Sequence, residues 1–463
     1  MAVWSQINYR IARDGNRFDA EYYQPNYVSL LSVLRKAQTI PLGERAFVTD
    51  GIHASPEVVD VGGVRYLSAK CVKDNDFALA DTLYISNQQN AANRRTQLRS
   101  GDILITTVGT IGNAAVVQPD FLPANADRHL GIVRLNDDSG LDPYFVAAFL
   151  TSRYGRLQTM REATGNVQLN LFIEKMKALL IPDLPCQVAV AELARKAYDR
   201  RRECEGLVRQ AESALDAALD LRRVDLTPRL FYEDTFVRAT AAGRFDAEYY
   251  QPAKRDALKA LAVTKGRPVG ELFRSVRQLW QPEGQPSTSE VRNYNLTDAL
   301  SPFLDDTTPT TPAAEIDSTK KLLKPGDLVV SRLRSYLKEI AVVLPSGDVP
   351  TVGSTEFIVL RPTKTSISPE ALLVFLRSPY VQTILTWSQD GSNHPRFDEK
   401  ALLAIPIPPT VEKLQDELCN KIKAATSARQ ESRRLLDTAK RVVEIAIEEG
   451  EAAALRFIAE KRG

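Results

Sequence analysis

The chain has 463 residues, about three times the length of a ~150-residue domain, which is enough for two to four compact units. Hydrophobic residues make up 44% and charged residues 25%, and no apolar run or signal-peptide pattern stands out, so we expect a cytoplasmic protein without a membrane segment. The four scattered cysteines predict free buried thiols, and the three histidines leave little material for a metal site. The net charge of +2 leaves nucleic-acid binding open.

The first distinctive segment is RFDAEYYQP, from Arg17 to Pro25, which recurs letter for letter from Arg244 to Pro252. Aligning the two copies, 227 positions apart (244 minus 17), brings further segments into register. Among them, LRSGDILITTVGTIGNAAVV (98–117) faces LKPGDLVVSRLRSYLKEIAVV (323–343). Because solenoid repeats run only ~20–50 residues, this spacing predicts the tandem duplication of a whole domain.

Each copy, or module, has the same internal order. A Gly-Asp turn precedes an aliphatic strand (GDILITTVG, GDLVVSRLR), and AAVV or IAVV predicts the strand paired with it. DPYFVAAFLTS and SPEALLVFLRS predict helices, because each has an Asp or Ser N-cap, Pro at the first helical position and helical spacing of apolar residues. A short helix and an Ile-Pro strand close the module. The predicted class is α+β with mixed sheets.

After each module the sequence becomes strongly helical. In 188–223 and 411–458, apolar residues recur three or four apart among dense charges, which predicts two long amphipathic helices. We expect them to pair as an antiparallel coiled coil; the alternative is two helices that each pack on their own module. The predicted organisation is a first module over 1–185, a helix over 186–223, a second module over 224–409 and a helix over 410–463, related by a pseudo-two-fold axis.

Taken together, these segments resemble the DNA-sequence specificity (S) subunits of type I restriction-modification enzymes. The segments that carry the resemblance are DGIHASP (50–56), YLSAKCV (66–72), SGDILITTVGTIGNAAVV (100–117), and LLIPDLP and LLAIPIPPTVEKLQDEL, which lead into the long helices. Any one of these motifs is weak by itself. The ordered set covers nearly the whole chain and occurs in both halves.

The resemblance implies two target recognition domains, each reading one half of an interrupted double-stranded DNA site. The helices would set the gap and dock two methyltransferase (modification) subunits, which restriction subunits would join in a phage-defence system. It also implies a non-catalytic chain that binds no cofactor, with S-adenosylmethionine, ATP and Mg²⁺ on the partners. In agreement, the sequence has no (N/D/S)PP(Y/F) tetrad, P-loop, HExxH or GxSxG. A structural adaptor that reads no DNA, a recognition subunit of another DNA-modification or defence system, and an enzyme acting alone are the alternatives.

Candidate DNA contacts in the first module lie on polar or basic segments, since Arg, Lys, Asn, Gln and Thr contact bases or phosphates. NRRTQLR fits phosphate contacts or a solvated helix face, GTIGN fits an approach to DNA or a tight turn, and GIHASP fits a contact or a structural hydrogen bond. The candidates are His53, Lys70, Arg94, Arg95, Thr110, Asn113, Asn166, Gln168 and Asn170.

In the second module, SRLRSYLK has basic or aromatic residues at alternating positions, which on a strand would share one face. The polar loop GSNHPR occupies the place of GNVQLN in the first module. These loops differ while their flanks match, as heads that read different half-sites would require; ordinary loop drift would look the same. The candidates are Arg332, Arg334, Tyr336, Lys338, Asn393, His394 and Arg396.

The aromatic residues of the repeated string are unchanged between the modules. A residue that reads DNA sequence should differ between heads that read different sequences. Their identity therefore predicts a scaffold role or a contact with a symmetric partner. These residues are Phe18, Tyr22, Tyr23, Phe245, Tyr249 and Tyr250.

Overall fold

The computed structural model describes residues 6–14, 17–60, 62–79, 82–165, 168–220, 224–286, 288–306, 308–344, 347, 349–364 and 366–462. The chain divides into two compact units. The first combines Met1–Arg201 with Gln430–Gly463, and the second is Arg202–Arg429. Among the residues just given, no helix is both long and apolar enough to cross a membrane. The cysteines are free, as expected.

The first unit contains short strands: β1 (Thr39–Pro41), β2 (Ala46–Asp50), β3 (Val64–Leu67), β4 (Val72–Lys73), β5 (Asp76–Phe77), β6 (Leu83–Ile85), β7 (Ile103–Thr106), β8 (Ala114–Val116), β9 (Ala124–Ala126), β10 (Leu130–Leu135) and β11 (Leu180–Pro182). Four of them form an antiparallel sheet in the order β2-β10-β7-β8. A second sheet, β6-β3-β9, is mixed, because β3 pairs antiparallel with β6 and parallel with β9. The predicted pair of strands after the Gly-Asp turn is β7 and β8.

The helices of the first unit are α1 (Tyr9–Asp14), η1 (Ala20–Tyr23), α2 (Pro25–Leu34), α3 (Leu42–Arg45), α4 (Asn87–Ala92), η2 (Arg94–Thr96), η3 (Pro119–Phe121), α5 (Pro143–Thr151), α6 (Arg153–Glu162), α7 (Ile173–Lys177) and α16 (Glu451–Arg462). The start of α5 is as predicted, since the Asp142 carboxylate accepts a hydrogen bond from the Tyr144 amide and Pro143 follows the cap. Every residue from Phe145 to Thr151 is buried. This helix is therefore central to the core of the unit.

The second unit repeats this pattern in its strands: β12 (Arg267–Pro268), β13 (Phe273–Val276), β14 (Leu279–Trp280), β15 (Glu290–Tyr294), β16 (Phe303–Leu304), β17 (Thr310–Pro312), β18 (Lys320–Leu323), β19 (Leu328–Ser331), β20 (Ile340–Val343), β21 (Thr351–Gly353), β22 (Phe357–Pro362), β23 (Gln389–Asp390), β24 (Arg396–Phe397) and β25 (Pro406–Ile407). The order β13-β22-β19-β20 matches β2-β10-β7-β8, with β16 added at the edge. The parallel pair β15 and β21 matches β3 and β9. The structure thus confirms the duplicated α+β module with mixed sheets.

The helices of the second unit are α9 (Phe236–Ala242), η4 (Ala247–Tyr250), α10 (Pro252–Val263), α11 (Val269–Leu272), η5 (Leu296–Leu300), η6 (Ala313–Glu315), η7 (Ser335–Leu337), α12 (Pro369–Arg377), α13 (Pro379–Thr386) and α14 (Glu399–Leu403). The predicted Ser368 cap of α12 accepts from the Ala371 amide. As α5 does in the first unit, α12 lies buried on the sheet of the second.

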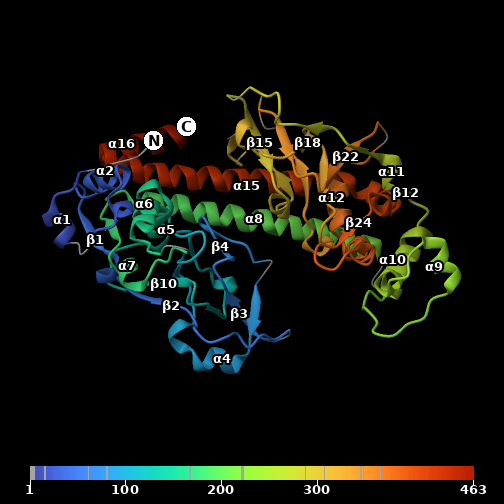
Figure 1. Cartoon of the computed structure of the whole chain (residues 1–463), viewed down its shortest axis with the longest axis horizontal. Helices are drawn as coiled ribbons and strands as arrows, with labels where there is room; N and C mark the ends of the chain where they lie inside the picture. Colours follow the sequence, from blue (N-terminus) through green and yellow to red (C-terminus); the bar gives the residue numbers. More distant parts are fainter. Residues whose placement is uncertain are drawn as a thin grey trace. The chain divides into compact units, whose positions relative to one another are not determined.

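Two long helices, α8 (Gln187–Leu219) and α15 (Pro409–Glu449), each contribute to both units. In the first unit the early part of α8 packs on the late part of α15, where the Ser432 hydroxyl donates to the Ala197 carbonyl at 2.7 Å. In the second unit Leu215 of α8 shares a core with Leu418 and Ile422 of α15. Early residues of one helix therefore meet late residues of the other, and the pair is antiparallel, as predicted (Figure 1).

Both units contain the same buried ion pair behind the Gly-Asp turn. Arg134 of β10 donates from Nε and Nη2 to the Asp102 carboxylate at 2.8 and 2.7 Å. Arg361 of β22 donates from the same two nitrogens to the Asp327 carboxylate, both at 2.6 Å. The two carboxylates are 2% and 1% exposed. Each also accepts a backbone amide of its own turn, from Arg99 or Lys324. The pair therefore fixes the turn to the neighbouring strand.

We expect Asp327→Ala to lower the free energy of unfolding by about 3–5 kcal/mol, because it leaves the Arg361 guanidinium without its partner in a low-dielectric site. The measurement is urea unfolding of the full chain. As a control, Glu431→Ala removes the exposed ion pair with Arg434 and should cost no more than about 1 kcal/mol. Equal losses in the two variants would contradict a structural role for the buried pair.

Candidate nucleic-acid interface

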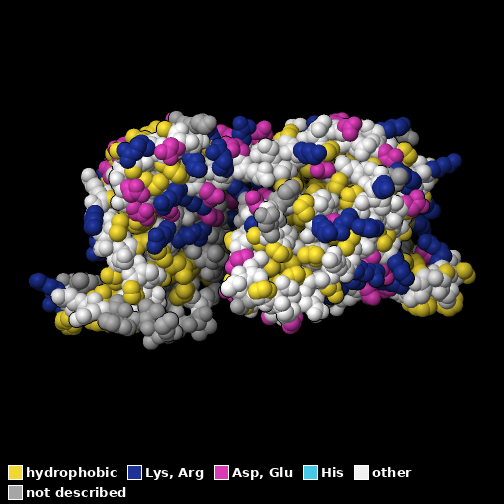
Figure 2. Space-filling model, turned by 90° about the horizontal axis from the view of Figure 1, so that it is seen from above, with side chains coloured by type: hydrophobic (Ala, Val, Ile, Leu, Met, Phe, Trp, Pro, Cys, Tyr) yellow, Lys and Arg dark blue, Asp and Glu magenta, His cyan; other side chains and the backbone are white. Residues whose placement is uncertain are grey.

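Net charge does not locate an interface in this chain. On the face shown in Figure 2, Lys and Arg side chains are interspersed with Asp and Glu over both units and are not gathered into one basic patch. We therefore locate candidate interfaces from the local geometry of the polar loops.

In the first unit, two polar segments that are far apart in sequence meet. The β7–β8 turn (107–113) lies against residues 164–165 and 168–170, and we call these segments the first loop pair. Val108 and Asn170 form a β-bridge, and the Leu171 amide donates to the Thr107 carbonyl at 3.0 Å.

The second unit brings the equivalent segments together. Residues 332–338 lie against 390–396, and we call these the second loop pair. Leu333 and Arg396 form a β-bridge, and the Phe397 amide donates to the Arg332 carbonyl at 3.1 Å. The structure thus joins, in each unit, two of the polar segments that the sequence singles out.

Within the first loop pair, Thr110 is exposed at the tip, between Gly109 and Gly112, both of which have positive φ (76° and 82°). Asn113 points inward instead, because its amide donates to the Val72 carbonyl at 3.3 Å. Gln168 is exposed. Asn170 is half-buried, and its side-chain amide donates a hydrogen bond to the Gln168 carbonyl. Asn166 lies outside the described residues.

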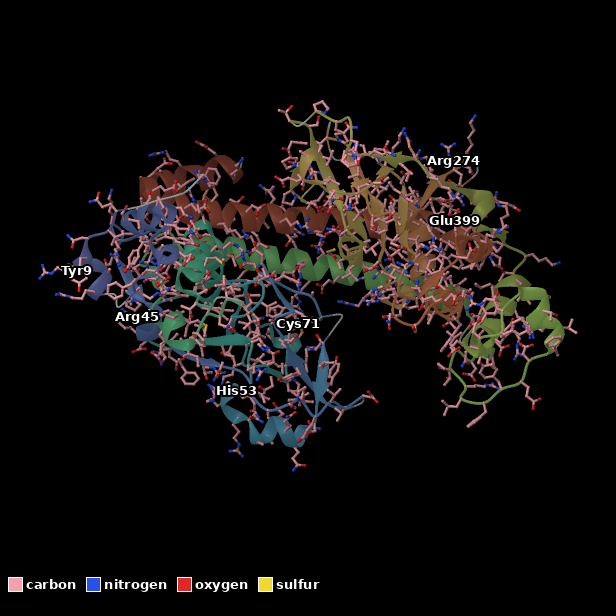
Figure 3. The ribbon with its side chains drawn as sticks, in the orientation of Figure 1. Tyr9, Arg45, His53, Cys71, Arg274 and Glu399 are labelled. Atoms are coloured by element: carbon pink, nitrogen blue, oxygen red, sulfur yellow. The ribbon has the colours of Figure 1, made fainter. Side chains whose placement is uncertain are left out.

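A carboxylate orients the basic side chains beside this loop pair. Asp50, at the end of β2, bonds the His53 imidazole at 2.6 Å, and the Arg95 guanidinium lies 3.4 Å from its other oxygen. The side chains of His53 and Arg95 remain 64% and 52% exposed. Figure 3 shows His53 among the outer side chains of this unit.

The remaining basic candidates of the first unit are on the surface. Arg94 is exposed on η2, so NRRTQLR forms a short 3-10 turn rather than the face of a longer helix. Lys70 is exposed in the turn after β3, and the described contacts do not join it to the other candidates.

Sequence reasoning missed the turn between β9 and β10, which connects these groups. The Arg128 amide donates to the Ile52 carbonyl at 3.1 Å, and the His129 carbonyl accepts from the Thr107 amide at 3.0 Å. The Arg128 side chain is exposed, and the imidazole of His129 lies 3.2 Å from the Asp127 carboxylate. The polar string DRH between two apolar strands was the signal available for it.

The prediction that SRLRSYLK continues as a strand is wrong. Strand β19 ends at Ser331, whose hydroxyl bonds the backbone of Leu333 and turns the chain. Arg334 and Lys338 have φ values of 49° and 54°, and the left-handed conformation cannot continue an extended strand. A 3-10 turn, η7, lies between them, so the alternating side chains do not share a strand face.

The candidates of the second loop pair nevertheless gather at one place. Arg396 binds Glu356 with Nε at 3.0 Å and Nη2 at 2.8 Å, and these hydrogen bonds lower the pKa of the Glu356 carboxyl. Arg334 lies 3.4 Å from the ring of His394. Arg332 is half-buried, and its Nε has no hydrogen-bond partner among the described residues.

The other candidates of the second loop pair differ in exposure. Tyr336 is 57% exposed, and Asn393 is exposed. Lys338 is half-buried, and its carbonyl accepts from Arg377 at 3.0 Å. Basic, aromatic and amide groups are therefore presented together, and the Glu356 carboxylate binds one of them, Arg396.

Comparison with known proteins gives matches among solved structures. The S subunit of a type I restriction-modification system from M. genitalium is 14% identical, with 89% of this chain and 95% of that chain covered and a TM-score of 0.40. The HsdS subunit from Thermoanaerobacter tengcongensis is 17% identical (89% and 97% covered, TM-score 0.29). A chain from a structure on assembly and conformational transition of the type I R-M system is 15% identical (89% and 98%, TM-score 0.29). No protein-family model and no curated protein matches the sequence.

The repeated string forms the same 3-10 turn in the two units, η1 and η4. Arg17 pairs with Asp19, and the Tyr23 hydroxyl donates to the Arg17 carbonyl at 3.0 Å. The Tyr22 hydroxyl donates to Glu162 at 2.8 Å, and the guanidinium of Arg17 lies 4.2 Å from the centre of its ring. Burial, together with the Glu162 charge, raises the pKa of Tyr22 to about 12.

The second copy repeats three of these contacts. Arg244 pairs with Asp246, the Tyr250 hydroxyl donates to the Arg244 carbonyl at 2.7 Å, and the Tyr249 ring lies 4.5 Å from the Arg244 guanidinium. The tyrosines thus hold the local fold in both units.

The phenylalanine of each copy is different, because it faces outward. Phe18 is 66% exposed beside Tyr9, with ring centres 6.5 Å apart, and Phe245 is 70% exposed beside Phe236 at 6.2 Å. Tyr9 lies at the outer edge of the first unit in Figure 3.

We expect Tyr22→Ala to lower the free energy of unfolding by about 2–3 kcal/mol, through loss of the Glu162 hydrogen bond and the contacts with guanidinium groups. Phe18→Ser should change it by no more than about 0.5 kcal/mol, since that ring is exposed. Urea unfolding of both variants is the measurement. A stability loss in Phe18→Ser equal to that in Tyr22→Ala would show that both rings belong to the scaffold.

Proposed function

We propose that this chain is the DNA-sequence specificity subunit of a type I restriction-modification system, in which each unit reads one half of a bipartite double-stranded DNA site. The proposal rests on the first and second loop pairs, which lie at equivalent positions in the two units. Each is held by the same backbone bridge, between Val108 and Asn170 or between Leu333 and Arg396, yet they present different side chains.

The chemistry at one bridge position illustrates the difference. Amide side chains pair with adenine edges and guanidinium groups with guanine edges in the major groove. Asn170 and Arg396 occupy the same bridge position in the two units. Equivalent positions can therefore read different bases without a change of fold.

We propose further that the chain is non-catalytic and works in the cytoplasm with partners. Two copies of a methyltransferase subunit would dock on the duplicated framework, and restriction subunits would join them. S-adenosylmethionine, ATP and Mg²⁺ would bind to these partners. The support is the exposed phenylalanine repeated in both units, Phe18 and Phe245, which suits contact with two identical subunits.

Each loop pair should determine only its own half-site. Selection of DNA from a random duplex pool by the complex with its modification partner should show changed letters in one half-site for Arg334→Gln, and in the other half-site for Gln168→Ala. Each lost base contact should cost about 1–3 kcal/mol against the preferred base. Arg434→Gln, on the exposed side of α15, is the control.

The same complex tests for DNA binding itself. Its affinity should fall steeply with salt, and Arg94→Gln should reduce the slope of log affinity against log salt by about 1 if that residue contacts a phosphate. Binding without salt dependence, or selection of no sequence at all, would contradict DNA recognition and favour a structural adaptor.

The long helices should determine the gap between half-sites. Inserting one helical heptad after Arg201 in α8 and another after Arg429 in α15 adds ~10 Å to each helix, about three base pairs of DNA. Pool selection should then yield a gap longer by about that amount, with the same half-site letters. An insertion in α8 alone, which breaks the antiparallel register, should abolish binding. Altered letters with an unchanged gap would overturn this role.

A further inference from the structure

The second unit contains a cavity of about 490 Å³ beside α9, η4 and α10. Its size falls within the ~300–1,000 Å³ range of small-ligand sites. Among the described residues, its lining includes basic, aromatic and amide side chains but no acidic one. The basic lining residues are Arg238, Lys254, Arg255 and Lys259.

The positive charges around this cavity are only partly compensated. Arg238 pairs with Asp234 at 2.7 Å, and Arg255 with Asp256 at 3.2 Å. Within the part of the chain that the structure describes, neither Lys254 nor Lys259 has a carboxylate at ion-pair distance.

Lys254 is the unusual member of this group, because its side chain is 7% exposed. Its ammonium lies 3.1 Å from the centre of the Tyr249 ring and donates to the carbonyls of Tyr249 and Trp387, both at 3.3 Å. Burying an ammonium without a carboxylate is costly. An anion in the cavity would supply the missing charge.

The surroundings of Lys254 are mostly basic. Burial, followed by the charge of Arg244, lowers the pKa of Lys254 to about 7; Asp246 opposes this shift, and Arg238 adds to it. The other ionisable residues of α10 and η4 are Glu248, Tyr249, Tyr250, Arg255, Asp256 and Lys259. Helix α13, which packs on α10, has no charged residue. The side chain is therefore partly neutral near pH 7 when the cavity holds no anion.

The first unit does not repeat this cluster. At the positions equivalent to the four basic residues it has Ile11, Tyr27, Val28 and Ser32. These four basic residues are therefore not part of the duplicated framework.

We propose that this cavity binds the phosphate group of a small phosphorylated molecule. Guanidinium and ammonium groups are the side chains that bind phosphate best, and a volume of about 490 Å³ is that of a small-molecule site. This site goes beyond the proposed recognition of DNA and does not depend on it.

Calorimetric titration of the full chain with adenosine monophosphate, and separately with inorganic phosphate, tests the site. We expect saturable binding with one site per chain, weakened about tenfold by Lys259→Gln or Arg255→Gln through loss of a charge-assisted hydrogen bond. Lys36→Gln, an exposed lysine of the first unit, is the matched control and should bind like the wild type.

Three outcomes would overturn the proposal. They are the absence of saturable binding, equal affinity in the Lys259→Gln and control variants, and complete displacement of adenosine monophosphate by stoichiometric duplex DNA. The last result would assign the cavity to a backbone phosphate of DNA.

A proton measurement tests the role of Lys254. Sulfate does not titrate near neutral pH, so its binding enthalpy at pH 7.5 should depend on the ionisation enthalpy of the buffer only if the chain takes up a proton. We expect uptake of a substantial fraction of a proton, falling toward zero at pH 5.5, where Lys254 is already charged. Lys254→Met should remove the uptake. Sulfate binding to the wild type without proton uptake at pH 7.5 would contradict the proposed site.

Discussion

The core of each unit is closed by parts of both long helices, and the rest of the architecture depends on this constraint. In the first unit, Val190 of α8 and Val442 of α15 belong to the same cluster as Phe145 of α5. In the second, Leu215 of α8 and Leu418 of α15 close the core over its sheet and helices. The first unit is therefore not a continuous stretch of chain, because residues 430–463 complete it, whereas the second is the single segment Arg202–Arg429.

The scaffold of each unit must stay constant, whereas the polar side chains on its loops can change. The strand order and the buried Asp102–Arg134 and Asp327–Arg361 pairs recur in both units, because they hold the sheet on which the loops are built. The loop segments are joined by backbone bonds. Backbone bonds do not depend on the identity of the side chain, so the polar side chains can diverge without loss of the scaffold.

Most of the fold was accessible from the sequence because its signals are local. The caps at Asp142 and Ser368, the Gly-Asp turns and the helical spacing of 188–223 each act within a few residues. The meeting of each loop pair depends on tertiary contacts that no local pattern encodes. The turn at Arg334 was missed for a related reason: its left-handed backbone lacks the glycine that normally signals it, and the alternating pattern resembled a strand.

Carboxylates fix the orientation of basic side chains among the candidate DNA contacts. Asp50 orients His53, and Glu356 holds Arg396 through two nitrogens. A basic side chain held in this way loses less conformational entropy when it meets a base, which favours specific contact. The carboxylate also weakens the attraction between the same cation and any DNA phosphate. The free energy of binding to DNA of arbitrary sequence is therefore less favourable. Interspersed charges and a net charge of +2 fit an interface whose selectivity depends on oriented side chains rather than on general attraction to the DNA backbone.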